Sequence, residues 1–237
     1  KVCPGRETKG NEWMLANVCF VCCRIRLFLA PSCCCLIFSR SAAPLALQEN
    51  ILVSSTAYLK ICDFGNARWL KHGTRARTLC GVPESTAPEM FVPNAAGNTT
   101  HGTAVDWWAL GVLSFELNVG WSPFYSENPM DIYGRVLASP NTLHYPDTAT
   151  KDQEESSAWA QAKSFTLGLL NRDETERLGA STSTKSAMHH AWMQHMGWHE
   201  LLHQNVVPPR GAFFPSHDVA RNFELHAPRE EAVPKPL

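Results

Sequence analysis

Hydrophobic residues follow two different patterns in the part of the chain after residue 44. Two short runs of β-prone residues, 51–53 and 58–61, are separated by a Ser-Ser-Thr sequence, which predicts a small β-hairpin. From Thr103 to Val119 almost every position is apolar, and a helix that is hydrophobic on all sides is a buried one. The large side chains of this predicted helix are Trp107, Trp108, Leu110, Val112, Leu113, Phe115 and Leu117.

The first 43 residues have an unusual cysteine content. Seven of the nine cysteines lie there, unlike a disulfide framework distributed through a secreted domain. Cys19 and Cys22 have the C-x-x-C spacing of a zinc site, but the next group is an uninterrupted run, and adjacent cysteines suit a tetrahedral ion poorly. The seven are Cys3, Cys19, Cys22, Cys23, Cys33, Cys34 and Cys35.

The same segment is largely apolar from residue 13 to residue 38. Two arginines and a proline interrupt it, and its uncharged runs, 13–23 and 27–39, are shorter than the ~20 residues that cross a bilayer. The split run also lacks the organisation of a secretory signal peptide. We therefore interpret 1–43 as a poorly specified segment that is not authentic coding sequence. A zinc or membrane role of its own is the weaker alternative.

Composition and charge exclude some classes of protein. Hydrophobic residues make up 44% of the 237 positions and charged residues 18%, a balance that excludes a chain disordered throughout. The 21 Lys and Arg residues against 22 Asp and Glu residues leave a net charge of -1. This argues against nucleic acid held by bulk positive charge. We expect neither a nucleic-acid nor a membrane partner.

Six motifs follow one another in a fixed order and together resemble a protein kinase. Their wording is most similar to the AGC group of Ser/Thr kinases, particularly those dependent on cyclic nucleotides, over about 44–225. The motifs are E-N-I-L at 49–52, D-F-G at 63–65, T-L-C-G-V-P-E at 78–84, A-P-E at 87–89, V-D-W-W-A-L-G-V-L at 105–113 and R-x-x-x-x-R-L-G at 172–179.

The resemblance implies a protein-kinase-like α+β fold of which only the C-terminal lobe is present. That lobe would be mainly α-helical, with a small β-hairpin before D-F-G. The expected divisions are a Cys-rich, non-kinase segment at 1–43, the C-terminal lobe at 44–204, and an AGC-like tail at 205–237.

The family's cofactors are ATP and Mg²⁺, and the resemblance assigns residues to both. Asp63 would supply a carboxylate for Mg²⁺ and Asn50 a neutral oxygen for a second metal ion, both beside the ATP phosphates. Gly65 permits the backbone to turn after the metal ligand. Phe223 resembles part of the AGC tail that reaches over the ATP pocket. The alternative for Asp63 is a turn carboxylate ahead of a glycine.

Substrate recognition and regulation also follow from the resemblance. Glu49 and Glu116 match positions that contact arginines preceding the phosphorylated residue, which predicts basic protein substrates. Each could instead be a surface glutamate. Thr78 matches the activation-loop threonine that an upstream kinase phosphorylates, and Arg68 is placed to pair with the phosphate. The alternative is a solvated basic loop around Thr78.

Three further residues are expected to support the lobe rather than the chemistry. Glu89 of A-P-E would form a buried ion pair with Arg177. Asp106, near the start of the apolar helix, would hold the catalytic loop by hydrogen bonds.

The chain departs from the family at the catalytic loop. Leu45 stands where the family has the Asp that accepts the substrate hydroxyl proton, and Leu47 where it has the Lys that neutralises the γ-phosphate. Pro44, Val82 and Ser85 replace a family Arg, Thr and Tyr. The chain also contains no G-x-G-x-x-G loop.

These features lead to two functional hypotheses. The intact parent would be a cytoplasmic enzyme that transfers the ATP γ-phosphate to Ser or Thr of basic proteins, whereas this chain alone would be inactive. The alternative is a pseudokinase or another non-catalytic protein-binding module.

Histidines are concentrated between residues 189 and 203. Without carboxylate or Cys partners, their near-helical spacing predicts a helix surface more readily than a metal site. They are His189, His190, His195, His199 and His203.

Overall fold

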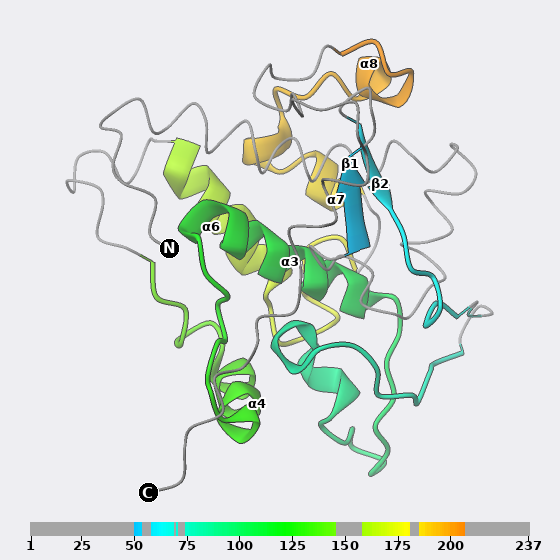
Figure 1. Ribbon diagram of the computed structural model, residues 1–237, viewed down its shortest axis with the longest axis vertical. Helices are drawn as coiled ribbons and strands as arrows, with labels where there is room; N and C mark the ends of the chain where they lie inside the picture. The colour runs from blue at the N-terminus through cyan, green and yellow to red at the C-terminus, as the bar shows by residue number, and fades with distance from the viewer. Residues whose placement is uncertain are drawn as a thin grey trace, which may run out of the picture. The chain divides into compact units, whose positions relative to one another are not determined.

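The computed structural model describes residues 50–53, 58–68, 70, 74–145, 158–180 and 185–206. The chain divides into two compact units, 1–207 and 208–237, and every described residue belongs to the first. The elements are mostly helical, with one two-stranded sheet (Figure 1). No helix among the described residues is long and apolar enough to span a bilayer.

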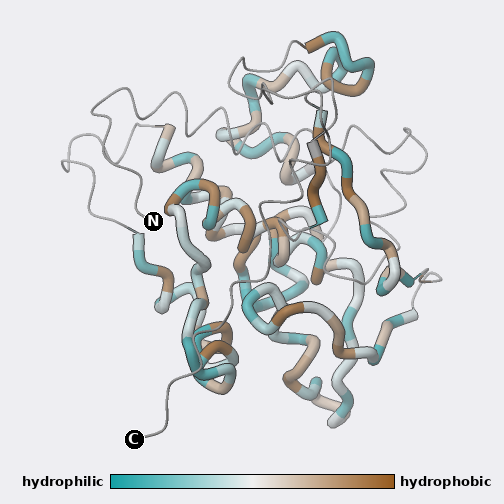
Figure 2. The backbone as a smooth tube through the Cα atoms, in the orientation of Figure 1, coloured by the Kyte–Doolittle hydropathy of each residue, from teal (hydrophilic) through white to brown (hydrophobic). Residues whose placement is uncertain are grey.

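The predicted hairpin strands pair in an antiparallel sheet. β1 (Ile51–Val53) lies against β2 (Leu59–Ile61), with Ile51 opposite Ile61 and Val53 opposite Leu59. The β1 strand is strongly hydrophobic along its length (Figure 2). Leu59 is buried, and Ile51 and Ile61 pack against the helical core, so the sheet is fixed to the helices below it.

The central helix α3 (Ala104–Val119) explains why its sequence is apolar on all sides. One side packs with α6 (Ala158–Leu169) and contributes Trp107, Leu110 and Leu113 to a first hydrophobic cluster. The opposite side contributes residues such as Trp108 to a second cluster. Because two separate cores cover the same helix, no polar stripe is left facing solvent.

The contact between α3 and α6 requires a residue without a side chain. A Cβ atom at Gly111 would lie 2.8–2.9 Å from side-chain atoms of Leu169 and Leu170, so any larger residue there would push against the end of α6. One turn further on, the hydroxyls of Ser114 and Thr166 lie 2.8 Å apart and satisfy each other inside the interface. The helix ends at Gly120, whose φ of 94° is the left-handed conformation of a C-cap.

The second cluster joins α3 to α4 (Pro129–Ala138). Trp108 stacks on Phe124 with ring centroids 5.6 Å apart, and Ile132 and Val136 of α4 complete this core. The side chain of Asn128 accepts a hydrogen bond from the Met130 amide and caps the start of α4. The remaining elements are η2 (Pro83–Ser85), η3 (Pro88–Met90), α7 (Lys185–Met188), η4 (Ala191–Met193) and α8 (Trp198–Leu202).

The histidine-rich stretch is not the single helix surface that its spacing predicts. His189 follows the end of α7, and His190 and His195 lie on either side of η4. Only His199 lies in the short helix α8, with His203 as its C-cap residue. His190 caps η4, because its side chain accepts a hydrogen bond from the Trp192 amide. The prediction was wrong because a spacing close to 3.6 residues does not exclude breaks between short helices.

Candidate functional site

The hairpin brings the two predicted metal ligands to one end of the sheet. The backbone amide of Cys62 donates a hydrogen bond of 2.8 Å to the carbonyl of Asn50, extending the strand pairing by one step. Asp63 is the next residue, so its carboxyl and the Asn50 side chain emerge from adjoining positions. Asp63 is exposed and Asn50 is partly buried. Carboxylate and amide oxygens are ligands that Mg²⁺ accepts.

The backbone at Asp63 has an uncommon conformation. Its φ is 55°, in the left-handed region that residues other than glycine rarely adopt. The amide of Gly65 donates a 3.2 Å hydrogen bond to Oδ1 of Asp63. A Cβ at residue 65 would lie 3.1 Å from that oxygen, so glycine keeps the turn open around the carboxyl. Asp63 Oδ2 makes no hydrogen bond with any described group, which leaves it available to a cation.

The predicted phosphosite and its partner are not in contact. Thr78 and Arg68 are both exposed, and neither side chain makes a hydrogen bond or ion pair within the described part of the chain. The segment before Thr78 is held in place by other means. Ala76 and His101 exchange two backbone hydrogen bonds of 2.9 Å each, which tie this segment to the loop that precedes α3.

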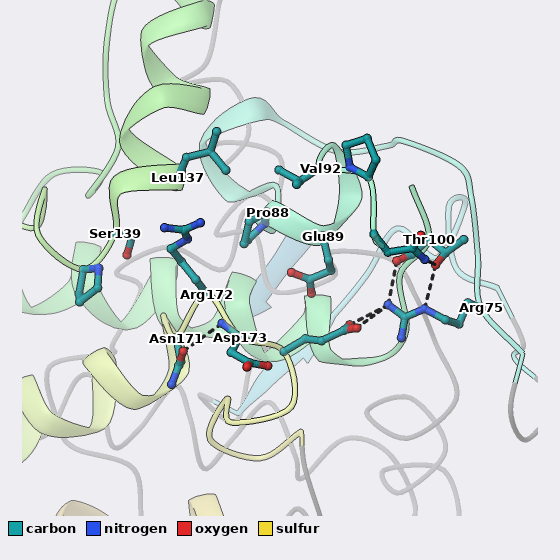
Figure 3. A pocket seen from close by; sticks show the side chains of 14 residues that line it. Arg75, Pro88, Glu89, Val92, Thr100, Leu137, Ser139, Asn171, Arg172 and Asp173 are labelled. Atoms are coloured by element: carbon teal, nitrogen blue, oxygen red, sulfur yellow. Dashed lines mark hydrogen bonds and ion pairs between the residues drawn. The ribbon is translucent and has the colours of Figure 1, made fainter. Parts of the chain in front are cut away.

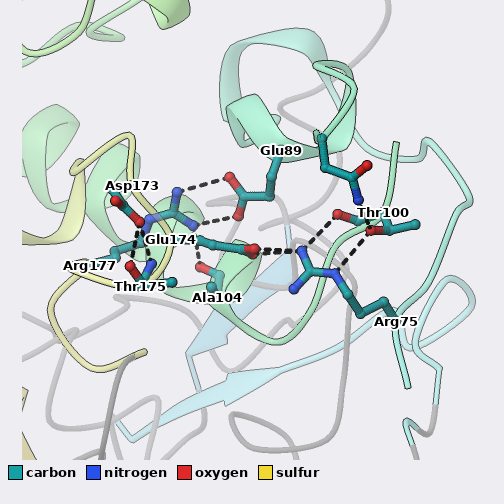
Figure 4. Close-up of polar contacts among 9 residues, drawn as sticks. Arg75, Glu89, Thr100, Ala104, Asp173, Glu174, Thr175 and Arg177 are labelled. Atoms are coloured by element: carbon teal, nitrogen blue, oxygen red, sulfur yellow. Dashed lines mark hydrogen bonds and ion pairs between the residues drawn. The ribbon is translucent and has the colours of Figure 1, made fainter. Parts of the chain in front are cut away.

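Arg75 reinforces that connection (Figure 4). Its Nε donates to the hydroxyl of Thr100 at 3.1 Å, and one terminal nitrogen donates to the Thr100 carbonyl at 2.7 Å. The same nitrogen lies 2.6 Å from a carboxylate oxygen of Glu174. Arg75 is therefore a structural link rather than a member of a solvated basic loop.

Glu89 and Arg177 form a bidentate ion pair deep in the domain (Figure 4). The two terminal nitrogens of Arg177 lie 2.6 and 2.9 Å from the two carboxylate oxygens. Arg177 also donates to the carbonyls of Ala104, at 2.8 Å, and Asn171, at 2.9 Å, and lies over the Trp108 ring. The guanidinium is fully buried, so these partners replace the water that it has lost.

An open groove of about 760 Å³ lies beside this ion pair (Figure 3). Pro88, Val92 and Leu137 supply apolar walls, and the exposed side chain of Arg172 extends along it. The residues that line the groove include none of the predicted ATP, metal or substrate residues. The groove is therefore distinct from the end of the hairpin.

Glu116 is partly buried and lies near a second carboxylate. Burial and, secondly, the negative charge of Glu84 raise the pKa of Glu116 to about 7. Glu84 lies in η2 and Glu116 near the end of α3, so two elements direct negative charge to one place. A cationic group entering there would relieve the repulsion between the two carboxylates.

Asp106, near the start of α3, is buried, with an exposed fraction of 1%. Its charge adds to the effect of burial in raising the pKa of the Cys80 thiol, which places Asp106 close to Cys80. The catalytic loop that it was expected to hold lies outside the described residues. The same is true of Leu45, Leu47, Glu49 and Phe223.

Sequence reasoning missed two features of this region. Glu84 belongs to the T-L-C-G-V-P-E motif, and its carboxylate could have been considered together with Glu116. The ion pair between Arg75 and Glu174 could not be recognised in the sequence, because 99 positions separate the two residues.

Comparisons with known proteins identify the family. The protein kinase domain family matches residues 48–193. The chain is 37% identical over 162 residues to cAMP-dependent protein kinase catalytic subunit 3 of Drosophila melanogaster. The matched region covers 68% of this chain and 25% of that relative. It is 33% identical over 183 residues to human cAMP-dependent protein kinase catalytic subunit PRKX, covering 75% of this chain and 45% of the relative.

A third relative is a yeast kinase. Serine/threonine-protein kinase YPK1 of Saccharomyces cerevisiae is 34% identical over 187 residues, covering 78% of this chain and 25% of the relative. The chain thus spans between 25% and 45% of the length of these three relatives. Both the domain match and the relatives agree with the ordered motifs. The chain belongs to the protein kinase family and, within it, to the AGC-type Ser/Thr kinases.

Proposed function

We propose that this chain carries the metal-binding and substrate-facing part of an ATP-dependent Ser/Thr kinase. The observation that supports this most directly is the end of the hairpin, where Asn50 and Asp63 occupy adjoining positions. Their oxygens suit Mg²⁺, which proteins usually bind through one or two carboxylates together with substrate phosphates. Bound Mg²⁺ would supply neutralising charge for the ATP phosphates. The turn at Gly65 would hold Asp63 in the orientation needed for this contact.

Basic protein substrates fit the charge distribution. Burial and, secondly, the negative charge of Glu84 raise the pKa of Glu116. An arginine of a substrate peptide would neutralise both and favour the charged form of Glu116. We include Glu49 in this acidic subsite from its motif position. Thr78 is exposed and thus accessible to an upstream kinase, with Arg68 as the proposed partner of its phosphate.

We propose that this chain by itself does not transfer phosphate. Leu45 and Leu47 cannot accept the substrate proton or neutralise the γ-phosphate, and no Gly-rich loop occurs in the sequence. The expected divisions at 1–43, 44–204 and 205–237 belong to the same proposal. A cytoplasmic location fits the free thiols of Cys62 and Cys80.

A non-catalytic binding module is the second candidate function. Leu45 and Leu47 favour it, because they remove the catalytic groups and leave the acidic subsite unchanged. Sequencing the messenger RNA of the parent gene would distinguish the two candidate functions. An in-frame sequence encoding an intact catalytic loop and a Gly-rich loop would support the kinase. Persistence of Leu45 and Leu47 in the mature message would support the binding module.

Two measurements on the purified chain test the proposal. In the first, radiolabelled ATP is incubated with Mg²⁺ and a basic Ser-containing peptide, and we expect no transfer above background. Labelling that disappears in Asp63→Ala would contradict the proposed inactivity. In the second, fluorescence anisotropy measures binding of the same peptide. We expect Glu116→Gln to weaken binding about tenfold, corresponding to the loss of a charge-assisted contact.

The exposed Glu127 provides a matched control for the binding experiment. Glu127→Gln makes the same substitution outside the proposed subsite, so it should leave the affinity unchanged. Equal weakening by both variants would show that bulk charge, rather than the Glu116 subsite, attracts the peptide.

A further inference from the structure

The short helix α8 is labelled in Figure 1. Two of its histidine side chains form a close pair. His199 lies in the helix, and His203 is its C-cap residue, one turn further along. Their ring centroids are 4.3 Å apart, with the ring planes inclined by 36°. Both side chains are exposed, and that of His199 has an exposed fraction of 78%. The pair is therefore accessible from solvent.

Hydrogen bonds determine which nitrogen of each ring carries the proton. His203 Nδ1 lies 2.8 Å from the backbone carbonyl of His199, and a carbonyl can only accept, so Nδ1 is the donor. His199 Nδ1 lies 3.2 Å from Oε1 of Glu200, an ionised acceptor. In a neutral imidazole the other nitrogen then carries the lone pair. In the neutral form of each ring the lone pair is therefore on Nε2, and no described group bonds to either Nε2 atom.

Glu200 is itself held in position. Its Oε2 accepts a 2.9 Å hydrogen bond from the side chain of Asn205, while Oε1 faces His199. Ligating histidines in metalloproteins usually donate their second nitrogen to a carboxylate or a backbone carbonyl, and those partners orient the ring and increase its basicity. Here the carboxylate of Glu200 is the partner of His199, and the backbone carbonyl of His199 is the partner of His203.

We propose that His199 and His203 form a two-histidine binding site for a first-row divalent cation such as Zn²⁺. Their Nε2 atoms would coordinate the ion, and water molecules would fill its remaining positions. Imidazole nitrogen suits Zn²⁺, Ni²⁺ and Cu²⁺, whereas Mg²⁺ prefers oxygen. This site is distinct from the hairpin end and does not depend on the proposed phosphoryl transfer. No group of three or more His, Cys, Asp or Glu ligands occurs among the described residues, so within that part of the chain the site has two protein ligands.

The site can be tested by chemical modification of the complete chain. Diethyl pyrocarbonate acylates an unprotonated imidazole nitrogen, and mass spectrometry reports the rate at each histidine separately. Zn²⁺ is added in excess over the thiols, so that cysteine-bound metal does not limit the result. We expect Zn²⁺ to slow modification of His199 and His203 together by at least about tenfold, since both Nε2 atoms become coordinated. Exposed His195 should keep its rate.

Variants distinguish chelation from unrelated protection. His203→Gln should abolish the protection of His199, and His199→Gln should abolish that of His203, because each ligand alone binds weakly. Glu200→Gln should raise the Zn²⁺ concentration needed for half-protection by about 10–100-fold. His195→Gln is the matched control, and in this variant Zn²⁺ should protect His199 and His203 as it does in the unaltered chain. Far-UV circular dichroism establishes that each variant is folded.

Three outcomes would overturn the proposal. One is equal protection of His195, which would indicate general masking by Zn²⁺. Another is protection of His199 that survives His203→Gln, since a single imidazole would then account for it. The third is the absence of any protection at saturating Zn²⁺ in the folded chain.

Discussion

One terminal nitrogen of Arg75 lies 2.6 and 2.8 Å from the two carboxylate oxygens of Glu174, 99 positions further along the chain. This contact joins the segment before the predicted phosphosite to the loop that follows α6. Thr100 adds two further hydrogen bonds to Arg75. The segment is therefore anchored by side chains already present, without a phosphate on Thr78.

Arg75→Gln should loosen this segment without unfolding the domain. The pair is partly exposed, with side-chain exposures of 39% for Arg75 and 25% for Glu174, so its contribution to the free energy of unfolding is about 0.2–1 kcal/mol. The local effect should be larger, because the Ala76 amide is hydrogen-bonded to the His101 carbonyl beside it. Hydrogen exchange at Ala76 should become faster. Arg77→Gln, at an exposed neighbour that has no ion-pair partner among the described residues, should not change that rate.

Glu89→Gln should destabilise the domain far more. Arg177 is fully buried, and loss of its carboxylate partner leaves an uncompensated charge, which typically costs about 3–5 kcal/mol. Urea unfolding would show this as a lower midpoint with an unchanged slope. Glu174→Gln is the surface counterpart and should cost no more than about 1 kcal/mol. Similar costs in both variants would contradict the structural role assigned to the buried pair.

Gly179→Ala should be destabilising for two separate reasons. Its φ is 90°, and an added Cβ would lie 2.4 Å from the Trp107 ring. Backbone strain of about 1–2 kcal/mol and overpacking of about 1–3 kcal/mol would act together. Gly120 has a φ of 94° with nothing within 4 Å of an added Cβ, so Gly120→Ala should show the backbone cost alone. Thermal unfolding of both variants separates the two effects, and equal losses would exclude the ring contact as a cause.

Glu116 should make stability fall as the pH rises. Burial and Glu84 raise its pKa from 4.5 to about 7, so the folded state binds the proton more tightly than the unfolded state. The carboxyl therefore costs nothing below about pH 4.5, and its cost increases until about pH 7. Glu116→Gln should stabilise the chain by about 1–2 kcal/mol at pH 8, after allowance for solvent screening, and leave it unchanged at pH 4.

The matched control for the pH experiment is again the exposed Glu127. Denaturant midpoints of Glu127→Gln should follow the unaltered chain at both pH values. A gain at pH 8 that also appears at pH 4 would show that Glu116→Gln improves packing rather than removing a titrating charge.

Local sequence was sufficient to predict the hairpin and the buried central helix. Alternation, turn residues and an uninterrupted apolar run act over a few positions, and these short-range patterns determine strands and helices. The division of α3 between two cores could not be predicted in this way. Trp107 and Trp108 are adjacent in sequence but belong to different clusters, and the packing partners of each come from distant segments.

The candidate site was predicted by motifs rather than by periodicity. The D-F-G and A-P-E signatures led to Asp63 and Glu89, because those residue types have fixed roles in one family. Contacts specific to this chain have no such signature. The pairing of His199 with Glu200 depends on a short helix and on the orientation of Nδ1, neither of which appears in residue spacing.

The partners of Arg177 determine an order of events during synthesis. Glu89 and the carbonyl of Ala104 precede Arg177 by 88 and 73 positions, so both are made long before their shared donor. Until the ribosome has released residue 177, neither can form its native contact. Completion of this domain therefore waits for the synthesis of Arg177, and a chain stopped before Arg177 leaves the carboxylate of Glu89 without the guanidinium that allows it to be buried.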